Sequence, residues 1–500
     1  MEFNFLQSLP VIAPEIGLMV MAVVVLFLDV YLPESQRRSI PLIAAAGLIA
    51  TAIASFFLWA PTPATEGLYW GGNMRFDSLA HIFKFMIVIA GAITCLLAMD
   101  TKSIAQRGEF YLIIIVSTLG ASLMSGAADL VMVFLALETT TIPLYILAAF
   151  RRDDARSAEA GMKYFLFGSF ASAILLYGLS LLYGFTGQSN LYAIAQYLGS
   201  PDFGINAAPI LISIALIIAG FGFKISAAPF HFWTPDVYEG APTPVTAYLS
   251  VASKAASFAL LMRFFLAVFP ESLVINGQMI SSFWTQLAAV LAVISMTFGN
   301  IVALAQKNIK RLLAYSSIAQ AGYTLIGIAA LSAGSETSVA SIAFYMFMYT
   351  FTNLLAFAVI VYFSESTGSE KIKDLAGLSR RNPMLALAMT IALLSLAGIP
   401  PAAGFFGKFF LFQAAVEANL VWLALIGVLN AIVALYYYLV VIKVMYVDHG
   451  DYEETDILVS RSGGWVMAVT AVMIILLGTI LATPVFDWAA QSAAGLLGVG

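Results

Sequence analysis

The feature that most constrains this chain is a series of long apolar runs that recurs along the whole sequence. A helix needs about 20 mostly apolar residues to cross a bilayer. The runs of that kind are 10–31, 40–60, 76–98, 109–126, 128–149, 160–185, 208–231, 243–269, 283–303, 312–332, 338–363, 382–418, 420–447 and 464–485. They predict an all-α polytopic membrane protein with about 14 transmembrane helices. Only 10% of the residues are charged, against about 25% in soluble domains, so a soluble fold is excluded.

Basic residues divide the connecting loops into two kinds. Most of the 23 Lys and Arg residues fall in the loops after every second apolar run, namely Arg37, Arg38, Lys102, Arg107, Arg151, Arg152, Arg156, Lys307, Lys310, Arg311, Lys371, Lys373, Arg380, Arg381 and Arg461. The opposite loops hold little more than Arg75. Because cytoplasmic loops collect Lys and Arg, this alternation predicts an even number of spans with both termini periplasmic. We expect a bacterial inner membrane, with the mitochondrial inner membrane as the secondary alternative.

Composition also excludes several classes of function. The formal net charge of -5 argues against a basic nucleic-acid-binding face. Cys95 is the single cysteine, so neither a disulfide nor a cysteine-ligated cluster can form within the chain. The histidines have no metal-ligand spacing, and no glycine-rich phosphate loop is found. We therefore expect no metal or cofactor site in this chain.

Charged residues inside the apolar runs are the main functional signal. Lys254 and Glu138 lie near the middle of their runs, and Lys224 and Lys408 lie beside helix-breaking Pro and Gly residues. A central Lys or Asp costs roughly 2.5–3.5 kcal/mol on insertion scales, so several of them are expected to be paired, hydrated or used. A buried lysine held near a carboxylate can gain or lose a proton when that partner moves. These four residues predict a proton relay; the alternative is a set of structural ion pairs.

Three other polar residues in the runs each have two competing interpretations. Lys163 lies a few residues inside its run, where reaching out to water competes with a relay role. His231 lies beside a helix break and is either a hydrogen-bonded structural histidine or a relay group. Lys84 fits either description. Three basic residues lie toward the ends of runs and are expected to snorkel to water: Arg75, Arg263 and Lys443.

Two of the runs, the seventh and the twelfth, are interrupted and carry a lysine. Pro229 and Pro235 follow Lys224, and the stretch 398–404 with two prolines precedes Lys408. Paired broken spans in two halves are typical of inverted-repeat transporters. We expect four segments: an N-terminal three-helix segment, 1–107; a first inverted five-helix repeat, 108–269; a second, 282–447; and a C-terminal span, 464–485.

Three motifs resemble those of one protein family. They are the stretch AQKNIKRLLAYSSIAQAGY at 305–323, the stretch from Lys224 to Pro244 with HFWTPDVYEGAPTP, and Leu137-Glu138 followed by Pro143-Leu144-Tyr145. They are similar to signatures of the proton-translocating antiporter-like proteins, which include the large membrane subunits of respiratory complex I and the Mrp-type Na+/H+ antiporters. The likeness covers roughly the second to the fourteenth span.

Within this family the chain is most similar to the N-type complex I subunits, the homologues of mitochondrial subunit 2. The break near the twelfth span carries Lys408, where M-type subunits usually have a glutamate. L-type subunits add a long lateral helix, for which 500 residues leave no room. The segment 396–412 also resembles the corresponding segment of N-type subunits.

The resemblance implies a proton-translocating subunit coupled to quinone reduction in other subunits. It implies that Glu138 tunes Lys224, that Lys254 is the central relay, and that Lys408 passes protons outward. It also implies that Lys163 joins proton entry on the cytoplasmic side. From its place beside the helix break, we expect His231 to join the relay. NADH, FMN, iron–sulfur clusters and quinone belong to partner subunits. The expected neighbours are the M-type antiporter-like subunit, the small K- and J-type subunits, and the lipid bilayer.

Three other functions stay open from sequence. A Mrp-type Na+/H+ antiporter subunit would be favoured by a glutamate at position 408 or by purification without redox subunits. A secondary carrier of an organic solute would have a polar pocket at the middle of the membrane. A structural scaffold would use its buried charges only to fix the register of its helices.

Overall fold

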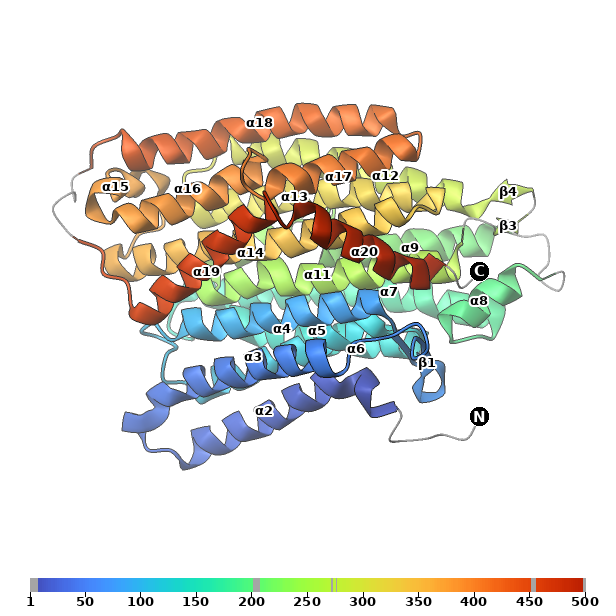
Figure 1. The fold of residues 1–500 in the computed structure, drawn as a ribbon, viewed down its shortest axis with the longest axis horizontal. Helices are drawn as coiled ribbons and strands as arrows, with labels where there is room; N and C mark the ends of the chain where they lie inside the picture. Colours follow the sequence, from blue (N-terminus) through green and yellow to red (C-terminus); the bar gives the residue numbers. More distant parts are fainter. Residues whose placement is uncertain (1–7, 201–206, 271–272, 276, 451–455, 498–500) are drawn as a thin grey trace.

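The computed structural model describes residues 8–200, 207–270, 273–275, 277–450 and 456–497, and in them the chain is a bundle of long helices (Figure 1). The α-helices are α2 (Ala13–Tyr31), α3 (Ile40–Leu58), α4 (Ser78–Ala98), α5 (Gly108–Gly126), α6 (Leu130–Ala148), α7 (Ala155–Thr186), α8 (Leu191–Leu198), α9 (Ala208–Lys224), α10 (Trp233–Gly240), α11 (Thr243–Val268), α12 (Ile280–Ala303), α13 (Ile309–Ala330), α14 (Glu336–Thr367), α15 (Leu378–Arg381), α16 (Pro383–Ala397), α17 (Gly404–Glu417), α18 (Val421–Tyr446), α19 (Arg461–Leu477) and α20 (Ala482–Leu497). The all-α polytopic fold predicted from the sequence is confirmed.

Short strands and 3-10 turns join these helices. The strands are β1 (Gly67–Tyr69), β2 (Met74–Phe76), β3 (Val274–Ile275) and β4 (Gln278–Met279). They form two antiparallel hairpins, in which Gly67 pairs with Phe76 and Val274 pairs with Met279. The 3-10 turns are η1 (Leu9–Ile12), η2 (Glu34–Ser39), η3 (Trp70–Gly72), η4 (Leu331–Ala333) and η5 (Ile372–Leu375).

Helix length and composition give fewer spans than the predicted count. Among the described residues, 11 helices are long and apolar enough to cross a membrane, or 12 if the bent pair α19–α20 is one span. That pair is bent by 79°, so the last predicted span is not one straight helix. The seventh and twelfth predicted spans correspond to the shorter apolar helices α9 and α16. The count of 14 is therefore not confirmed.

The two predicted helix breaks are present. α9 ends at Lys224 and the chain becomes helical again at α10, while α16 ends at Ala397 and α17 begins at Gly404. Each break contains a cis proline peptide, Ala228-Pro229 in one and Pro400-Pro401 in the other. Gly404 has no room for a side chain, because a Cβ there would collide with the Ser395 carbonyl oxygen. The breaks therefore sit where packing holds irregular backbone inside the protein.

The basic loops meet at one end of the bundle, which we call the basic end. Arg151 forms an ion pair with Glu365 at 3.7 Å, the Ile372 amide donates to the Lys307 carbonyl at 2.9 Å, and Arg380 donates to the Asp448 carbonyl at 3.0 Å. The opposite end, which we call the hairpin end, carries β1–β2 and β3–β4, and both the first turn of α2 and the end of α20 lie there (Figure 1). This arrangement agrees with the alternation of basic loops seen in the sequence.

Three helices form the centre of the bundle. Within their spanning windows α14 is 100% buried, and α11 and α13 are each 94% buried. The outer helices α2, α3, α7, α12 and α18 expose large apolar side chains, such as Phe170 on α7 and Ile432 on α18. Lys254 of α11 and the polar side chains of α13 therefore lie in the most enclosed part of the described structure.

One expectation about basic residues is wrong for Arg263 and Arg75. Neither reaches water, since Arg263 is 1% exposed and Arg75 is 6% exposed. The Arg263 guanidinium pairs with both carboxylate oxygens of Asp77, at 2.6 and 2.8 Å, and Arg75 donates to the same carboxylate at 3.2 Å. The buried carboxylate of Asp77 explains why both arginines stay inside the protein. It is the counter-charge of its neighbour Arg75 and of Arg263, which is far away in the sequence. Lys443, by contrast, is 62% exposed and pairs with Asp448, as expected for a snorkelling residue.

Candidate functional site

Lys254 lies at the centre of a buried polar cluster. Its ammonium donates to the Ser317 carbonyl oxygen at 2.8 Å and to the Ser317 hydroxyl at 2.5 Å. The same hydroxyl accepts from Tyr349 at 3.0 Å and bonds the Tyr238 hydroxyl at 3.1 Å. Three helices, α10, α13 and α14, therefore converge on the Lys254 ammonium of α11. A buried ammonium with hydroxyl partners can pass a proton to them and recover it, because each hydroxyl both donates and accepts.

A line of hydrogen bonds and one ring contact leads from this cluster to Lys408. Tyr349 stacks on Tyr345, with ring centroids 6.5 Å apart, and the Tyr345 hydroxyl donates to the Gln320 side-chain oxygen. Gln320 Nε2 donates at 3.1 Å to the Leu396 carbonyl, which also accepts from the Lys408 ammonium at 2.9 Å. We call the buried groups Lys254, Ser317, Tyr349, Tyr345, Gln320 and Lys408 the central file. The last two residues of α16, just before the break, supply the carbonyls that hold Lys408.

Beyond Lys408 the polar groups continue toward α12 and α18. The Lys408 ammonium lies 4.7 Å from the centre of the Tyr323 ring. Asn300 donates to the Tyr323 hydroxyl at 3.2 Å and accepts from the Tyr437 hydroxyl at 3.1 Å. Asn430 donates to Thr297 at 3.3 Å and accepts from Asn300. Uncharged polar side chains therefore continue beyond Lys408, the residue that the sequence analysis expects to pass protons outward.

Glu138 and Lys224 lie apart from the central file. The Glu138 carboxylate of α6 is half-buried and accepts from the Ser172 hydroxyl of α7 at 2.5 Å. Lys224 is 3% exposed, and its ammonium has no hydrogen-bond partner among the described residues, although Glu138 is close enough to act on it electrostatically. No hydrogen bond between described residues joins either side chain to Lys254. The structure thus brings Lys254 and Lys408 together on one file but does not connect them with Lys224.

His231 is buried beside the first helix break. It is 7% exposed and its ring packs against Phe298 at 4.6 Å between centroids. Its Nδ1 has no hydrogen-bond partner among the described residues. Most buried ring nitrogens in proteins have a hydrogen-bond partner, and this one has none among the described residues. The relay role of His231 stays a prediction.

Lys163 belongs to a charged network at the basic end. Its ammonium lies 2.6 Å from Glu159 and 2.6 Å from Asp236 of α10. Asp236 also pairs with Arg311 at 2.8 Å, and Arg311 pairs with Glu239 at 3.0 Å. The network fastens α10 to α7 on one side and to α13 on the other. Lys163 is therefore tied to the helix that carries Tyr238, a neighbour of Lys254.

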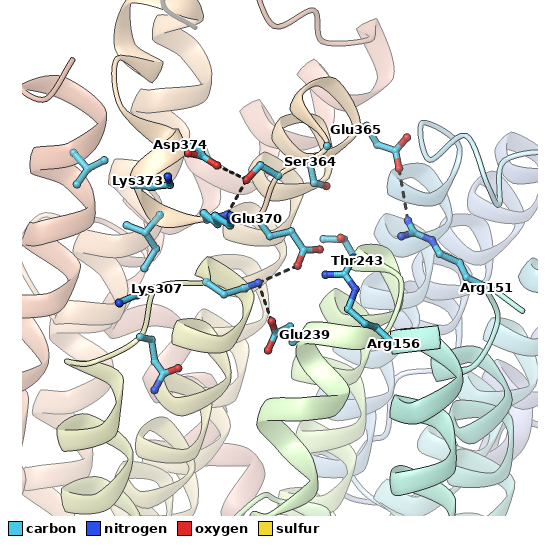
Figure 2. A pocket seen from close by; sticks show the side chains of 17 residues that line it. Arg151, Arg156, Glu239, Thr243, Lys307, Ser364, Glu365, Glu370, Lys373 and Asp374 are labelled. Atoms are coloured by element: carbon cyan, nitrogen blue, oxygen red, sulfur yellow. Dashed lines mark hydrogen bonds and ion pairs between the residues drawn. The ribbon is translucent and has the colours of Figure 1, made fainter. Parts of the chain in front are cut away.

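A large pocket opens at the basic end between α10, α11 and the loop that follows α14 (Figure 2). Its volume is about 1200 Å³, and charged residues of both signs line it. Asn308 donates to Glu239 and to Glu370, at 3.2 Å each, and so bridges the first and second halves of the chain across the pocket floor. Lys310, in the first turn of α13, is 1% exposed. Its ammonium donates to the Glu239 backbone carbonyl at 2.9 Å and to the Glu370 carboxylate at 3.1 Å. The sequence interpretation of Lys310 as a loop residue is therefore wrong.

Similarity to known proteins agrees with these features. The family model described as "NADH:quinone oxidoreductase/Mrp antiporter, TM" matches residues 127–434. The NADH-quinone oxidoreductase subunit N of Trichlorobacter lovleyi is 44% identical over 466 residues, which are 91% of this chain and 92% of the relative.

Two solved structures share the fold. A chain in respiratory complex I from Thermus thermophilus with bound aureothin is 31% identical, with a TM-score of 0.78, and the match covers 95% of this chain and 99% of that chain. A chain of the Mrp complex from Dietzia sp. is 20% identical, with a TM-score of 0.79 over 99% of this chain and 98% of that chain, which shows a common fold only. The chain belongs to the NADH:quinone oxidoreductase/Mrp antiporter membrane family and, within it, groups with the relatives named NADH-quinone oxidoreductase subunit N.

Proposed function

We propose that this chain is a proton-translocating membrane subunit of NADH:quinone oxidoreductase and that its protons move along the central file. The observation that carries the proposal is the line of contacts from Lys254 through Ser317, Tyr349, Tyr345 and Gln320 to the carbonyl that holds Lys408. Every group in it is buried, so a proton that enters it is shielded from bulk water along its length.

Protons reach this file from the basic end. The pocket of Figure 2 touches Glu239 and Thr243 at the junction of α10 and α11. Tyr238, next to Glu239 in sequence, bonds the Ser317 hydroxyl and so connects α10 with Lys254. Lys163 and Asp236 hold α10 from the side. A change in these ion pairs moves α10, and with it the hydroxyl that touches the Lys254 cluster.

Glu138 and Lys224 act as the part of the relay that responds to neighbouring subunits. Glu138 is half-buried on the outer side of α6 and α7, where a partner within the membrane can reach it. Lys224 has no hydrogen-bond partner among the described residues, so the energy of its ammonium depends strongly on the charge of Glu138. His231 adds a proton acceptor beside the break. An altered Glu138–Lys224 pairing thereby changes the charge that Lys254 experiences.

The energy comes from other subunits. Moving one elementary charge across 100 mV costs roughly 2.3 kcal/mol, which requires an external source. Quinone reduction in partner subunits supplies it, and NADH, FMN, iron–sulfur clusters and quinone are bound there. The neighbours are the M-type antiporter-like subunit and the small K- and J-type subunits. The basic end faces the cytoplasm of a bacterial inner membrane, with both termini periplasmic.

The four segments predicted from the sequence fit this proposal. α9–α10 and α16–α17 are the corresponding broken elements of the two inverted repeats. The Mrp-type alternative is less well supported, because position 408 is a lysine and the structural likeness to the Mrp chain is at only 20% identity.

Replacing Gln320 with leucine tests the proposal. The leucine removes the amide that joins the Tyr345 hydroxyl to the Leu396 carbonyl, while keeping a side chain of similar size. We expect NADH-driven proton pumping by the assembled complex to fall roughly tenfold, because a barrier increase of about 1.4 kcal/mol is enough for that. The matched control is Gln413→Leu, whose amide bonds only Glu417 among the described residues, at the surface. Normal pumping by the Gln320 variant in an intact complex would exclude the central file as the route.

A further inference from the structure

A second cluster of titratable side chains lies in the N-terminal helices, away from the central file. The Lys84 ammonium of α4 pairs with the Glu15 carboxylate of α2 at 2.9 Å and donates to the Val11 carbonyl at 2.9 Å. The Ser122 hydroxyl of α5 donates to the same Glu15 oxygen at 2.6 Å. Glu15 is 3% exposed and Lys84 is 4% exposed. This ion pair therefore sits inside the bundle, near the hairpin end where α2 and α4 begin (Figure 1).

His81 lies one turn before Lys84 on α4 and is 6% exposed. Its ring stacks on the Phe56 ring with centroids 5.5 Å apart, and its Nε2 has no hydrogen-bond partner among the described residues. A neutral imidazole carries a proton on one nitrogen and a lone pair on the other, and an imidazolium carries a proton on both. His81 therefore presents a ring nitrogen without a partner in a buried position.

That nitrogen has a cavity and other unpaired polar atoms around it. His81, Lys84 and Ser55 line a small cavity of about 10 Å³ beneath Trp59 and Phe76. The Ser55 hydroxyl and the second carboxylate oxygen of Glu15 are, like His81 Nε2, buried without a partner among the described residues. A cavity holds a water molecule when it has about 10–15 Å³ and two to four polar partners. Trp59, which also lines the cavity, is 40% exposed, so the cavity lies close to the surface at the hairpin end.

We propose that Glu15, Lys84 and His81, together with one water molecule in this cavity, form a proton-binding site that exchanges its proton with the hairpin side of the membrane. A proton passes from the water to His81 Nε2, so the neutral ring becomes an imidazolium whose two nitrogens both donate. The Glu15 carboxylate supplies the negative charge of the cluster. The cluster then carries one positive charge instead of none, and deprotonation by water restores the starting state.

Besides Lys84 and Glu15, the charged residue that contacts His81 in the described part of the chain is Asp77, whose backbone carbonyl accepts from the His81 amide at 3.1 Å. α3 contributes Ser55 and Phe56, whose ring lies 5.5 Å from the His81 ring, and β2 contributes Phe76. Trp488 of α20 covers Phe56 at 5.5 Å. The nearby Arg75 and Asp77 are bonded to one another, and Asp77 also pairs with Arg263. Glu15 and Lys84 are therefore the charges that set how strongly His81 binds its proton.

A structural ion pair alone does not account for these features. Such a pair is stable when its remaining polar atoms are bonded. Here one Glu15 oxygen, the Ser55 hydroxyl and His81 Nε2 have no partner among the described residues, and Ser55 and His81 line a cavity of the size of one water. The inference does not depend on the central file, because the cluster and the file share no residue.

Infrared difference spectroscopy of the assembled complex tests the site. With ring-13C-labelled histidine, spectra taken during mild acidification contain an imidazolium band that is absent from the His81→Phe variant. Phenylalanine keeps the ring contact with Phe56. The matched control is His449→Phe, which removes an exposed histidine at the basic end and leaves the band unchanged. Identical parent and His81→Phe spectra would overturn the proposal.

Two further variants separate proton binding from a structural role of the ion pair. Glu15→Gln keeps the side-chain shape but removes the negative charge, and it makes proton binding by His81 at least about tenfold weaker. The double variant Glu15→Gln/Lys84→Met leaves no unpaired charge, so the complex assembles normally, and the lost effects of the two opposite charges on His81 offset each other. Unchanged His81 titration in the Glu15→Gln variant contradicts the proposal, and so does an empty cavity in a high-resolution map of the complex.

Discussion

Replacing Lys254 with alanine is expected to abolish NADH-driven proton pumping while the complex stays assembled. The ammonium of this 2%-exposed residue holds the Ser317 hydroxyl, to which Tyr238 and Tyr349 also bond. Alanine leaves no proton-carrying group at this point of the file. We expect a loss of tenfold or more, which needs a barrier increase of only about 1.4 kcal/mol.

Stability is not expected to fall to the same extent in this variant. A central lysine costs roughly 2.5–3.5 kcal/mol on insertion scales, and alanine avoids that cost. The measurement is the pumping rate of inverted membrane vesicles together with the content of assembled complex. Lys443→Ala is the control, since that side chain is 62% exposed and lies outside the file. Pumping at the parent rate in the Lys254 variant would show that the relay assignment is wrong.

Replacing Arg263 is expected to give the second large effect, a loss of stability at the hairpin end. Replacing Arg263 with methionine leaves the Asp77 carboxylate buried, with Arg75 as its remaining basic partner at 3.2 Å. Breaking a buried ion pair on one side typically costs about 3–5 kcal/mol. We expect the free energy of unfolding to fall by about that amount and the complex to lose the subunit on mild heating.

One double variant separates the effect of charge from the effect of shape in this pair. The double variant Arg263→Met/Asp77→Asn should recover part of the stability, because asparagine can still accept from the Ala80 amide as Asp77 does at 2.8 Å. If the double variant is no more stable than Arg263→Met, loss of the packed arginine side chain, rather than an unpaired carboxylate, explains the defect.

The pH dependence of this pair has a definite sign. Burial raises the pKa of the Asp77 carboxyl, but Arg263 and Arg75 outweigh burial and hold that pKa below its ordinary value. A lowered pKa in the folded protein gives stability that is present above the unfolded value of about 3.9 and is lost as the pH falls through the folded value. The contribution of this ion pair to the stability of the parent should therefore be constant above about pH 5 and should fall below it, which thermal unfolding of the parent complex between pH 3 and pH 7 measures.

The sequence predicted the membrane fold and the central lysines because both depend on local composition. A charge within 20 apolar residues stands out whatever the fold, so Lys254, Lys408 and Lys224 could be identified. The two helix breaks were visible because Pro and Gly act on their own backbone. The number of spans could not be predicted in the same way, because composition alone does not distinguish a broken or bent helix from a straight one.

The polar residues that join the lysines could not be identified in the same way. Ser317, Gln320 and Tyr345 are uncharged, and such residues are tolerated in apolar helices without a functional role. Ser317 and Gln320 do lie three positions apart on α13, which puts them on one face, but nothing in the sequence shows which helix packs there. Arg263 was misjudged for a related reason, because its partner Asp77 is far away in the sequence.

The role of the lysines as proton donors, rather than as fixed charges, is tested most directly by Lys408→Arg. Arginine keeps a positive charge near the Leu396 and Ala397 carbonyls that now hold Lys408, at 2.9 and 3.0 Å, but it does not release its proton in proteins. The quantity to measure is the number of protons pumped per NADH oxidised by the assembled complex. Our account predicts a clear fall in that number, and an unchanged number would contradict it.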